Sequence, residues 1–186
     1  GINDFQNADP PFSAAATDYV FITHAHIDHT GLLPLLYRDG FRGRIYATAA
    51  TTELCGIMLR DCAHIQESDA EWLNRKRKRA GGEMTEPLYT MQDAEGVLQL
   101  FTPCHYGELV HVAEGIDIRF IDAGHLLGSA SIEVMLKENG VEKKLIFSGD
   151  IGNVNQPLIK NPTYPTDADY VIMESTYGDR SHGVRP

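Results

Sequence analysis

Six consecutive residues of this sequence, His24–His29 (HAHIDH), carry four side chains that can bind a metal ion. The hexapeptide holds three of the eight histidines of the chain. It comes directly after the apolar run Tyr19–Thr23, so all four side chains leave the end of one predicted strand together. Neutral imidazole and carboxylate groups suit zinc, and ligands on a tight turn can converge without the chain folding back. The spacing therefore predicts a metal site at this strand end.

Two further segments place a ligand-type residue after a predicted strand. His125 closes a DAGH sequence that follows the alternating run Ile116–Ile121, and Asp150 closes an SGD sequence that follows Lys144–Phe147. Open β/α folds gather functional groups at the carboxyl ends of their strands, so residues distant in sequence meet there. We therefore expect His125 and Asp150 to join the hexapeptide.

The strands that must position these residues are predicted from short runs of β-branched and aromatic residues. In chain order they are Tyr19–Thr23, Arg44–Ala47, Ile116–Ile121, Ile132–Leu136, Lys144–Phe147 and Tyr170–Met173. The continuous apolar run Leu145–Phe147 predicts a strand buried on both faces. An Asn139-Gly140 pair predicts a tight hairpin between two of the strands.

Two helices are predicted between the second and third of these strands. Apolar residues at helical spacing from Leu54 to Ile65 predict a long helix that Thr48 can cap and that Gly81-Gly82 ends. A shorter helix is predicted over Gln92–Leu100. The chain is therefore expected to be α/β, or α+β in some schemes.

The metal motifs resemble a known family. HAHIDH at 24–29, AGHLLGSA at 123–130 and FSGD at 147–150 are similar to successive metal motifs of the metallo-β-lactamase superfamily. ESTYGDR at 174–180 resembles the opening motif of its β-CASP branch, which includes the RNA-cleaving subunit of the polyadenylation machinery and its bacterial and archaeal relatives. The resemblance implies an αβ/βα sandwich of two mixed β-sheets with outer helices, truncated here. Residues 1–186 would form a partial metallo-β-lactamase domain, with the β-CASP region starting near 174–186.

The resemblance also implies a role for each motif residue. Six side chains would hold two zinc ions: one ion by His24, His26 and His125, the second by Asp28 and His29, and both by Asp150. A hydroxide between the ions would attack the substrate. Asp28, Asp150 and Glu174 would be catalytic, and Glu174 would assist a proton donor.

The family pattern is incomplete in this sequence. The last zinc-ligand histidine of the family and the histidine partner of Glu174 would come after Pro186. The second metal site is then one protein ligand short, and we expect the isolated 186 residues to show little or no nuclease activity. His182 is not assigned as a substitute, because a histidine in a terminal Gly/Arg/Pro-rich tail is more often solvated.

The expected function is that of a zinc-dependent hydrolase, specifically an RNA phosphodiesterase. Two alternatives stay open. The metal motifs alone do not distinguish substrates, so a thioester or another small molecule is the first alternative. The second is a non-catalytic scaffold subunit of a nuclease assembly, although such subunits usually lose ligands and this chain keeps every ligand that it is long enough to contain.

Composition restricts the partners and the location. A formal net charge of −10 excludes a protein coated in basic surface, although bound metal ions would offset part of that charge. No run approaches the roughly 18 apolar residues that a membrane span needs. Three cysteines without a CxxC pair do not suggest a disulfide framework. We expect a cytoplasmic protein with RNA as its partner and no membrane contact, able to form a homodimer through regions outside this sequence.

One segment is strongly cationic. The run Arg75–Arg79 (RKRKR) holds five of the sixteen basic residues. It could attract phosphates, or it could be a solvated helix end that the helix macrodipole favours. Trp72, Tyr89 and Tyr106 show no pattern of a base-stacking platform and are expected to be packing residues.

Overall fold

The computed structural model describes residues 12–80, 82–176 and 178–179, and the chain divides into two compact units. Unit 1 comprises Gly1–Val20, His26–Tyr46 and Leu54–Thr102, and unit 2 comprises Phe21–Ala25, Ala47–Glu53 and Pro103–Pro186. Among the described residues, no helix combines the length and the apolar composition that crossing a membrane requires.

A small sheet contains the first three strands, in the order β1-β2-β3. They are β1 (Tyr19–Phe21), β2 (Arg44–Thr48) and β3 (Phe101–Cys104), and a 3-10 turn, η1 (Ala14–Ala16), precedes them. The middle strand is the most buried, with Ile45 and Ala47 fully inaccessible. Strand β3 was not predicted because Pro103 interrupts its sequence. A proline lacks the N–H group that a sheet needs, and an edge strand such as β3 tolerates that loss.

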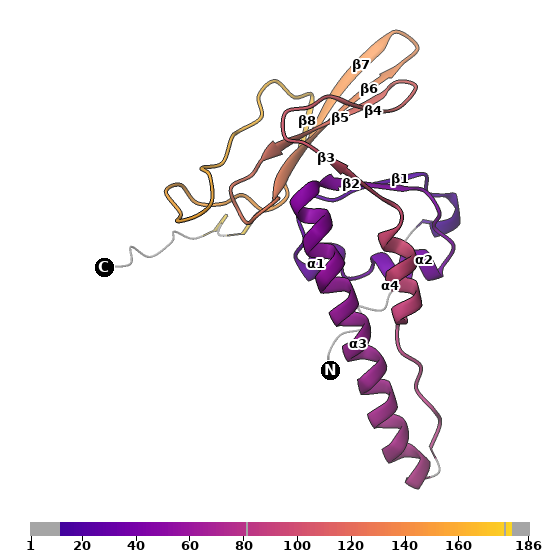
Figure 1. Ribbon diagram of the computed structural model, residues 1–186. Coiled ribbons are helices and arrows are strands. Elements are labelled where there is room, and N and C mark those ends of the chain that lie inside the picture. The colour runs from indigo at the N-terminus through magenta and orange to yellow at the C-terminus, as the bar shows by residue number, and fades with distance from the viewer. Residues whose placement is uncertain (1–11, 81, 177, 180–186) are drawn as a thin grey trace. The chain divides into compact units, whose positions relative to one another are not determined.

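Unit 1 is mainly helical (Figure 1). Its helices are α1 (Ile27–Thr30), α2 (Leu33–Arg38), α4 (Met91–Leu98) and most of α3 (Ala49–Ala80). The predicted cap of α3 is confirmed, because the Thr48 hydroxyl accepts a hydrogen bond of 3.2 Å from the Thr51 backbone N–H. Helix α4 begins with a capping box in which Thr90 and Asp93 bond reciprocally.

The segment after α3 returns along the helix to α4 (Figure 1). The Asn74 side chain holds it, bonding both the N–H and the carbonyl of Thr85 at 2.7 and 2.8 Å. Helices α2 and α4 pack closely because Gly96 has no side chain. A Cβ at that position would lie 2.3 Å from the Tyr37 ring.

Unit 2 contains a mixed sheet in the order β4-β5-β6-β7-β8. Its strands are β4 (Val110–Ala113), β5 (Ile116–Asp122), β6 (Ala130–Glu138), β7 (Val141–Phe147) and β8 (Tyr170–Ile172). The first four are antiparallel neighbours, and β8 runs parallel to β7. The predicted hairpin joins β6 to β7, with positive φ angles of 50° at Asn139 and 78° at Gly140.

The predicted fold class is confirmed, since the chain is mixed α/β with two sheets. One burial prediction was wrong. Leu145 is half-buried and Phe147 is 37% exposed, so of the run 145–147 only Ile146 is buried. The reason is the neighbouring strand β8, which has only three residues, all of them exposed.

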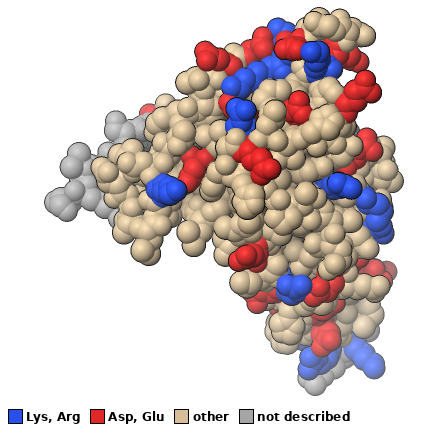
Figure 2. Space-filling view, turned by 45° about the horizontal axis from the view of Figure 1, so that its top comes forward, with Lys and Arg blue, Asp and Glu red and all other residues tan. Residues whose placement is uncertain are grey.

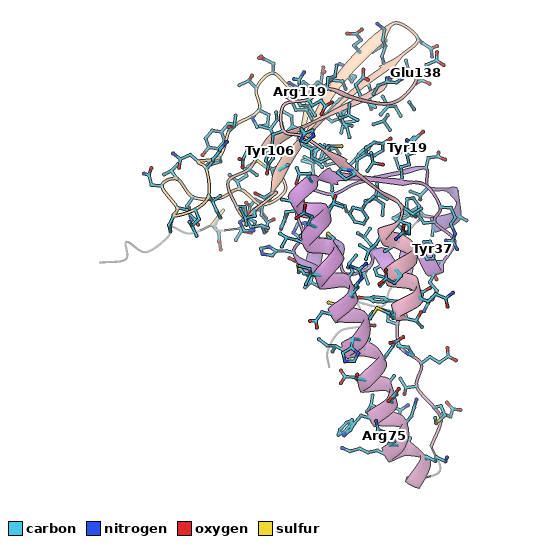
Figure 3. The ribbon with its side chains drawn as sticks, viewed as in Figure 1. Tyr19, Tyr37, Arg75, Tyr106, Arg119 and Glu138 are labelled. Atoms are coloured by element: carbon cyan, nitrogen blue, oxygen red, sulfur yellow. The ribbon has the colours of Figure 1, made fainter. Side chains whose placement is uncertain are left out.

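A buried carboxylate joins three strands of this sheet. Glu133 of β6 is 3% exposed, and it accepts a hydrogen bond of 3.1 Å from Arg119 of β5, a residue labelled in Figure 3. Its other oxygen lies 2.5 Å from Nζ of Lys144 on β7. The Lys144 ammonium also donates to the carbonyl of Thr166 at 2.9 Å, which attaches the loop before β8. A buried charge is tolerated here because it is paired on both sides.

We expect Glu133→Ala to lower the free energy of unfolding by about 1.5–3 kcal/mol, because Arg119 and Lys144, whose side chains are 36% and 26% exposed, would lose a charged hydrogen-bond partner. Urea denaturation followed by circular dichroism measures the change. Glu142→Ala is the matched control, because Glu142 pairs with Lys137 at 2.6 Å but both side chains are at least 65% exposed. The control should leave stability almost unchanged. Equal losses in the two variants would contradict this account.

Candidate metal centre

Four of the predicted ligands come together. His24, His26, His125 and Asp150 each offer one ligand atom, and these atoms all lie within 4.8 Å of one another. Oδ2 of Asp150 is 3.6 Å from Nε2 of His24 and 3.5 Å from Nε2 of His125. The rings of these two histidines stand nearly perpendicular, with centroids 5.1 Å apart and an interplanar angle of 84°. Three imidazoles and a carboxylate facing one point form a donor set that could hold a metal ion.

The residue before His24 fixes the orientation of its ring. His24 is fully buried three residues after β1, and its Nδ1 shares a hydrogen bond of 3.1 Å with the Thr23 hydroxyl. With Nδ1 engaged, Nε2 is the nitrogen that faces Asp150. Metal-binding histidines usually have such a partner on the second nitrogen. Sequence reasoning assigned Thr23 to the strand and missed this role.

The loop that carries His125 is held by a serine. The hydroxyl of Ser129 accepts hydrogen bonds from the backbone N–H groups of His125 and Leu126, at 3.0 and 3.1 Å. The carbonyl of Ser129 in turn accepts from the Tyr106 hydroxyl at 2.8 Å. Burial, and then the negative charge of Asp122, raise the pKa of Tyr106, so the phenol stays a neutral donor. Tyr106 therefore supports this loop through its hydroxyl, although 41% of the residue is exposed.

The first turn of α3 forms hydrogen bonds with the same loop. The hydroxyls of Thr48 and Thr51 lie 2.7 and 2.9 Å from the carbonyl oxygen of Gly128, and both threonines are buried. Gly128 has a φ of +83°, and a Cβ on it would lie 2.5 Å from the Thr51 nitrogen. Only glycine allows this approach. The AGHLLGSA motif thus contains both a ligand-type residue, His125, and the glycine, Gly128, that lets its loop pack against α3.

The loops of His125 and Asp150 touch through their backbones. Gly152 donates a hydrogen bond of 2.8 Å to the Ala123 carbonyl. A Cβ on Gly152 would lie 1.6 Å from the Gly124 carbonyl oxygen and 2.7 Å from the His125 nitrogen. This contact brings Asp150 and His125 together, and sequence reasoning did not find it, because an isolated glycine carries no signal of its neighbour.

Glu174 contacts the Asp150 turn on both sides. Its carboxylate oxygen Oε1 accepts a hydrogen bond of 2.6 Å from the Ile151 backbone N–H. Its own backbone N–H donates to the Ser148 hydroxyl at 3.0 Å. The Glu174 carboxylate therefore holds the backbone of the turn that carries Asp150.

The group of four does not include the other two predicted ligands. Asp28 and His29 lie on α1, where Oδ2 of Asp28 is 3.7 Å from Nε2 of His29. The Asp28 side chain is 74% exposed and the His29 side chain 32% exposed. Part of the last motif, Tyr177 and Arg180, lies outside the described residues, as does His182.

Cysteine does not contribute to the group of four. Burial raises the pKa of Cys55 and of Cys104 to about 11 in each case, so both thiols stay protonated near neutral pH. Burial also raises the pKa of Cys62. The centre is therefore a nitrogen and oxygen site.

The chain is similar to characterised proteins over most of its length. It is 37% identical over 171 residues to ribonuclease TTHA0252 of Thermus thermophilus, a match that covers 92% of this chain and 34% of that protein. It is 32% identical over 189 residues to transcription termination factor FttA of Pyrococcus abyssi, covering 95% of this chain and 26% of that factor. The chain thus spans between a quarter and a third of the length of these relatives.

Solved structures also resemble the chain. One of them is the native FEZ-1 metallo-β-lactamase from Legionella gormanii, with a TM-score of 0.46, 21% sequence identity, and coverage of 83% of this chain and 50% of that one. No protein-family model matches the chain.

The sequence matches and the motifs agree on the class. The chain is a homologue of ribonuclease TTHA0252 and of FttA, which are proteins of the β-CASP branch of the metallo-β-lactamase superfamily. The resemblance found in the motifs is therefore confirmed.

We expect Gly152→Ala to lower the free energy of unfolding by about 1–3 kcal/mol or more, because the new methyl group must push the two loops apart. Thermal and urea unfolding measure this loss. Gly56→Ala is the control: it adds the same methyl group within α3, where the nearest atom, on the flexible Arg60 side chain, is 3.4 Å away. The control should gain about 0.5–1 kcal/mol. A Gly152→Ala variant as stable as the wild type would show that the loops do not meet in this way.

Proposed function

We propose that this chain is the metal-binding part of a zinc-dependent RNA phosphodiesterase. The observation that carries the proposal is the meeting of His24, His26, His125 and Asp150, in a chain that is 37% identical to a ribonuclease. The relatives are named as a ribonuclease and a transcription termination factor, which favours RNA over a thioester as the substrate. The intact ligand set does not favour a scaffold role.

The proposed ligand assignment follows the motifs. His24, His26 and His125 would hold one zinc ion, Asp28 and His29 would contribute to a second, and Asp150 would bridge the two. The donor chemistry fits, because imidazole nitrogens and carboxylate oxygens are the usual ligands of catalytic zinc. The Asp28 side chain is 74% exposed and the His29 side chain 32% exposed, whereas His24 is fully buried, so the two residues of the proposed second position are the more accessible ones.

When bound, two such ions would lower the pKa of a water molecule and neutralise charge that develops on a phosphodiester. The residues around the centre fix the positions of the ligand side chains. Buried His24 is oriented by Thr23, His125 is held by Ser129, and the Asp150 turn is held by Glu174. We propose that Glu174 serves the reaction mainly through this backbone contact, and that assistance to a proton donor would be an additional role.

Several wider features belong to the same proposal. Residues 1–186 would be part of a metallo-β-lactamase domain, with the β-CASP region beginning near 174–186. The partner would be RNA, and the complete protein could form a homodimer. A cytoplasmic location is supported by the cysteines, since Cys55, Cys62 and Cys104 are all free thiols.

We expect Asp150→Ala to abolish phosphodiester cleavage by the full-length protein and to reduce the zinc bound per chain, because one carboxylate oxygen faces both His24 and His125. Cleavage of labelled single-stranded RNA and metal analysis of the purified protein are the measurements. Asp61→Ala, at an exposed position on α3, should change neither quantity. Full activity in Asp150→Ala would rule out the proposed centre.

We expect Glu174→Ala to weaken zinc binding by roughly 10- to 100-fold, the range typical of groups that orient metal ligands. Glu174→Gln should keep most of the affinity, because an amide oxygen can still accept the Ile151 N–H. Titration against a zinc-buffering chelator gives the affinity, and the melting curve of each variant shows whether it is folded. If Gln were as damaging as Ala while both variants stayed folded, the charge of Glu174 and not its hydrogen bond would be what matters.

A further inference from the structure

The C-terminal part of α3 has two distinct faces. On a helix of 3.6 residues per turn, Trp72 lies between Lys76, about 40° away, and Arg75, about 60° away on the other side. Asn74 and Arg77 lie on the opposite face, and Lys78 lies at the border, between Arg75 and Asn74. The sequence RKRKR therefore does not form a uniform cationic surface, and its members have different neighbours.

The face with Asn74 and Arg77 braces the returning segment. Arg77 donates to the carbonyl of Glu83 at 3.2 Å and to the hydroxyl of Thr85, next to the two bonds that Asn74 makes with Thr85. These contacts use Arg77 for structure. They also hold this end of α3 against the segment around Thr85. The opposite face of the helix is therefore fixed in position.

The other face is open to solvent. Trp72 is 53% exposed, so the expectation that it is a packing residue is wrong. Nζ of Lys76 lies 3.4 Å from the centroid of its ring, and the Arg75 side chain is 74% exposed with one weak bond, of 3.3 Å, to Glu71. Figure 3 labels Arg75 near the far end of the helix, and in Figure 2 basic side chains lie at that end with acidic side chains next to them. A hollow of about 250 Å³ lies beside them, lined by Glu71, Asn74, Arg75, Lys78 and Met84.

We propose that this face, defined by Trp72, Arg75, Lys76 and Lys78, binds single-stranded RNA. The segment 72–82 contains five basic residues and no acidic one, in a chain whose net charge is −10. Cationic side chains along a strand of phosphates, with an exposed aromatic ring for a base, are the elements of sequence-tolerant recognition of single strands. The inference rests on the proposed function, because it gives the RNA substrate a second contact in addition to the metal ligands.

The favourable interaction of cations with a helix C-terminus does not account for this face. The macrodipole stabilises positive charge in the last turn of a helix. It gives no reason for a tryptophan to remain half exposed beneath a lysine ammonium, where the ring is already in contact with a cation. The exposed Trp72 ring could stack with a nucleobase, and the neighbouring cations could bind the phosphates of the same strand.

Trp72 is the only tryptophan of these 186 residues, so the difference in emission between the full-length protein and its Trp72→Phe variant reports on this face. The experiment titrates the full-length protein, kept in EDTA to prevent cleavage, with single-stranded oligouridylate at several salt concentrations. We expect saturable quenching of Trp72 that weakens as salt rises. Fluorescence anisotropy of labelled RNA measures the affinity of variants whose tryptophan is replaced.

The charge test compares two double variants that each remove two positive charges. Arg75→Ala/Lys78→Ala should bind RNA about tenfold more weakly, and its plot of log affinity against log salt should be less steep by about 1.4, or 0.7 for each lost phosphate contact. Lys137→Ala/Lys160→Ala, at two exposed positions of unit 2, should bind like the wild type. Trp72→Phe should bind better than Trp72→Ala, because phenylalanine can still stack.

The outcomes separate this inference from the proposed function. If RNA is cleaved normally but leaves Trp72 emission unchanged, and the Arg75/Lys78 variant keeps the wild-type affinity, the surface is wrong and the nuclease assignment stands. If polyglutamate quenches Trp72 as strongly as RNA does, the surface binds acidic protein segments and the inference is overturned. A full-length protein that neither binds nor cleaves RNA overturns both.

Discussion

The constraint on which the candidate centre depends is the backbone contact between the turn after β7 and the loop after β5. Gly152 lies so close to Gly124 that no side-chain atom fits between them, and this contact brings the Asp150 carboxylate to the His125 imidazole. The strand register carries the turn and the loop to the same end of the sheet, since Phe120 pairs with Ile132 and Ile132 pairs with Phe147. The sheet brings the turn and the loop to the same end, and the two glycines allow their backbones to come into contact.

Around this contact, side-chain hydroxyl groups form the hydrogen bonds with backbone groups that helices and sheets supply elsewhere. The loops after the strands leave backbone groups without ladder partners, and a buried polar group must be satisfied. Ser129 receives two backbone N–H groups, Ser131 donates to the Ser148 carbonyl at 2.8 Å, and Thr48 and Thr51 converge on Gly128. Most of the buried polar residues of unit 2 thus hold the ligand-bearing loops, which gives the centre a rigid surround before any ion binds.

The sequence predicted well whatever depends on residue type and local period. The strand ends with their ligand residues, the Thr48 cap, the long helix and the Asn139-Gly140 hairpin follow from local rules, and the structure contains them. Strand β3 was hidden by Pro103, and the exposure of Phe147 depends on a short neighbouring strand. The contacts of Gly152 with Gly124 and of Glu174 with Ile151 join residues more than 20 positions apart, so no local pattern contains them. For the same reason Trp72 was taken for a packing residue, because periodicity alone does not say which face of a helix a returning segment will cover.

Strand β8 has a practical consequence for work with this chain. Its only strand partner among the described residues is β7, and Tyr170, Val171 and Ile172 are each 49–57% exposed. An exposed apolar edge with unused backbone donors and acceptors is a template for another strand, and this edge carries none of the lysines or prolines that usually block such pairing. Concentrated samples of these 186 residues should therefore associate through β8, so dilute conditions, or a lysine placed in the strand, would favour crystals over aggregates.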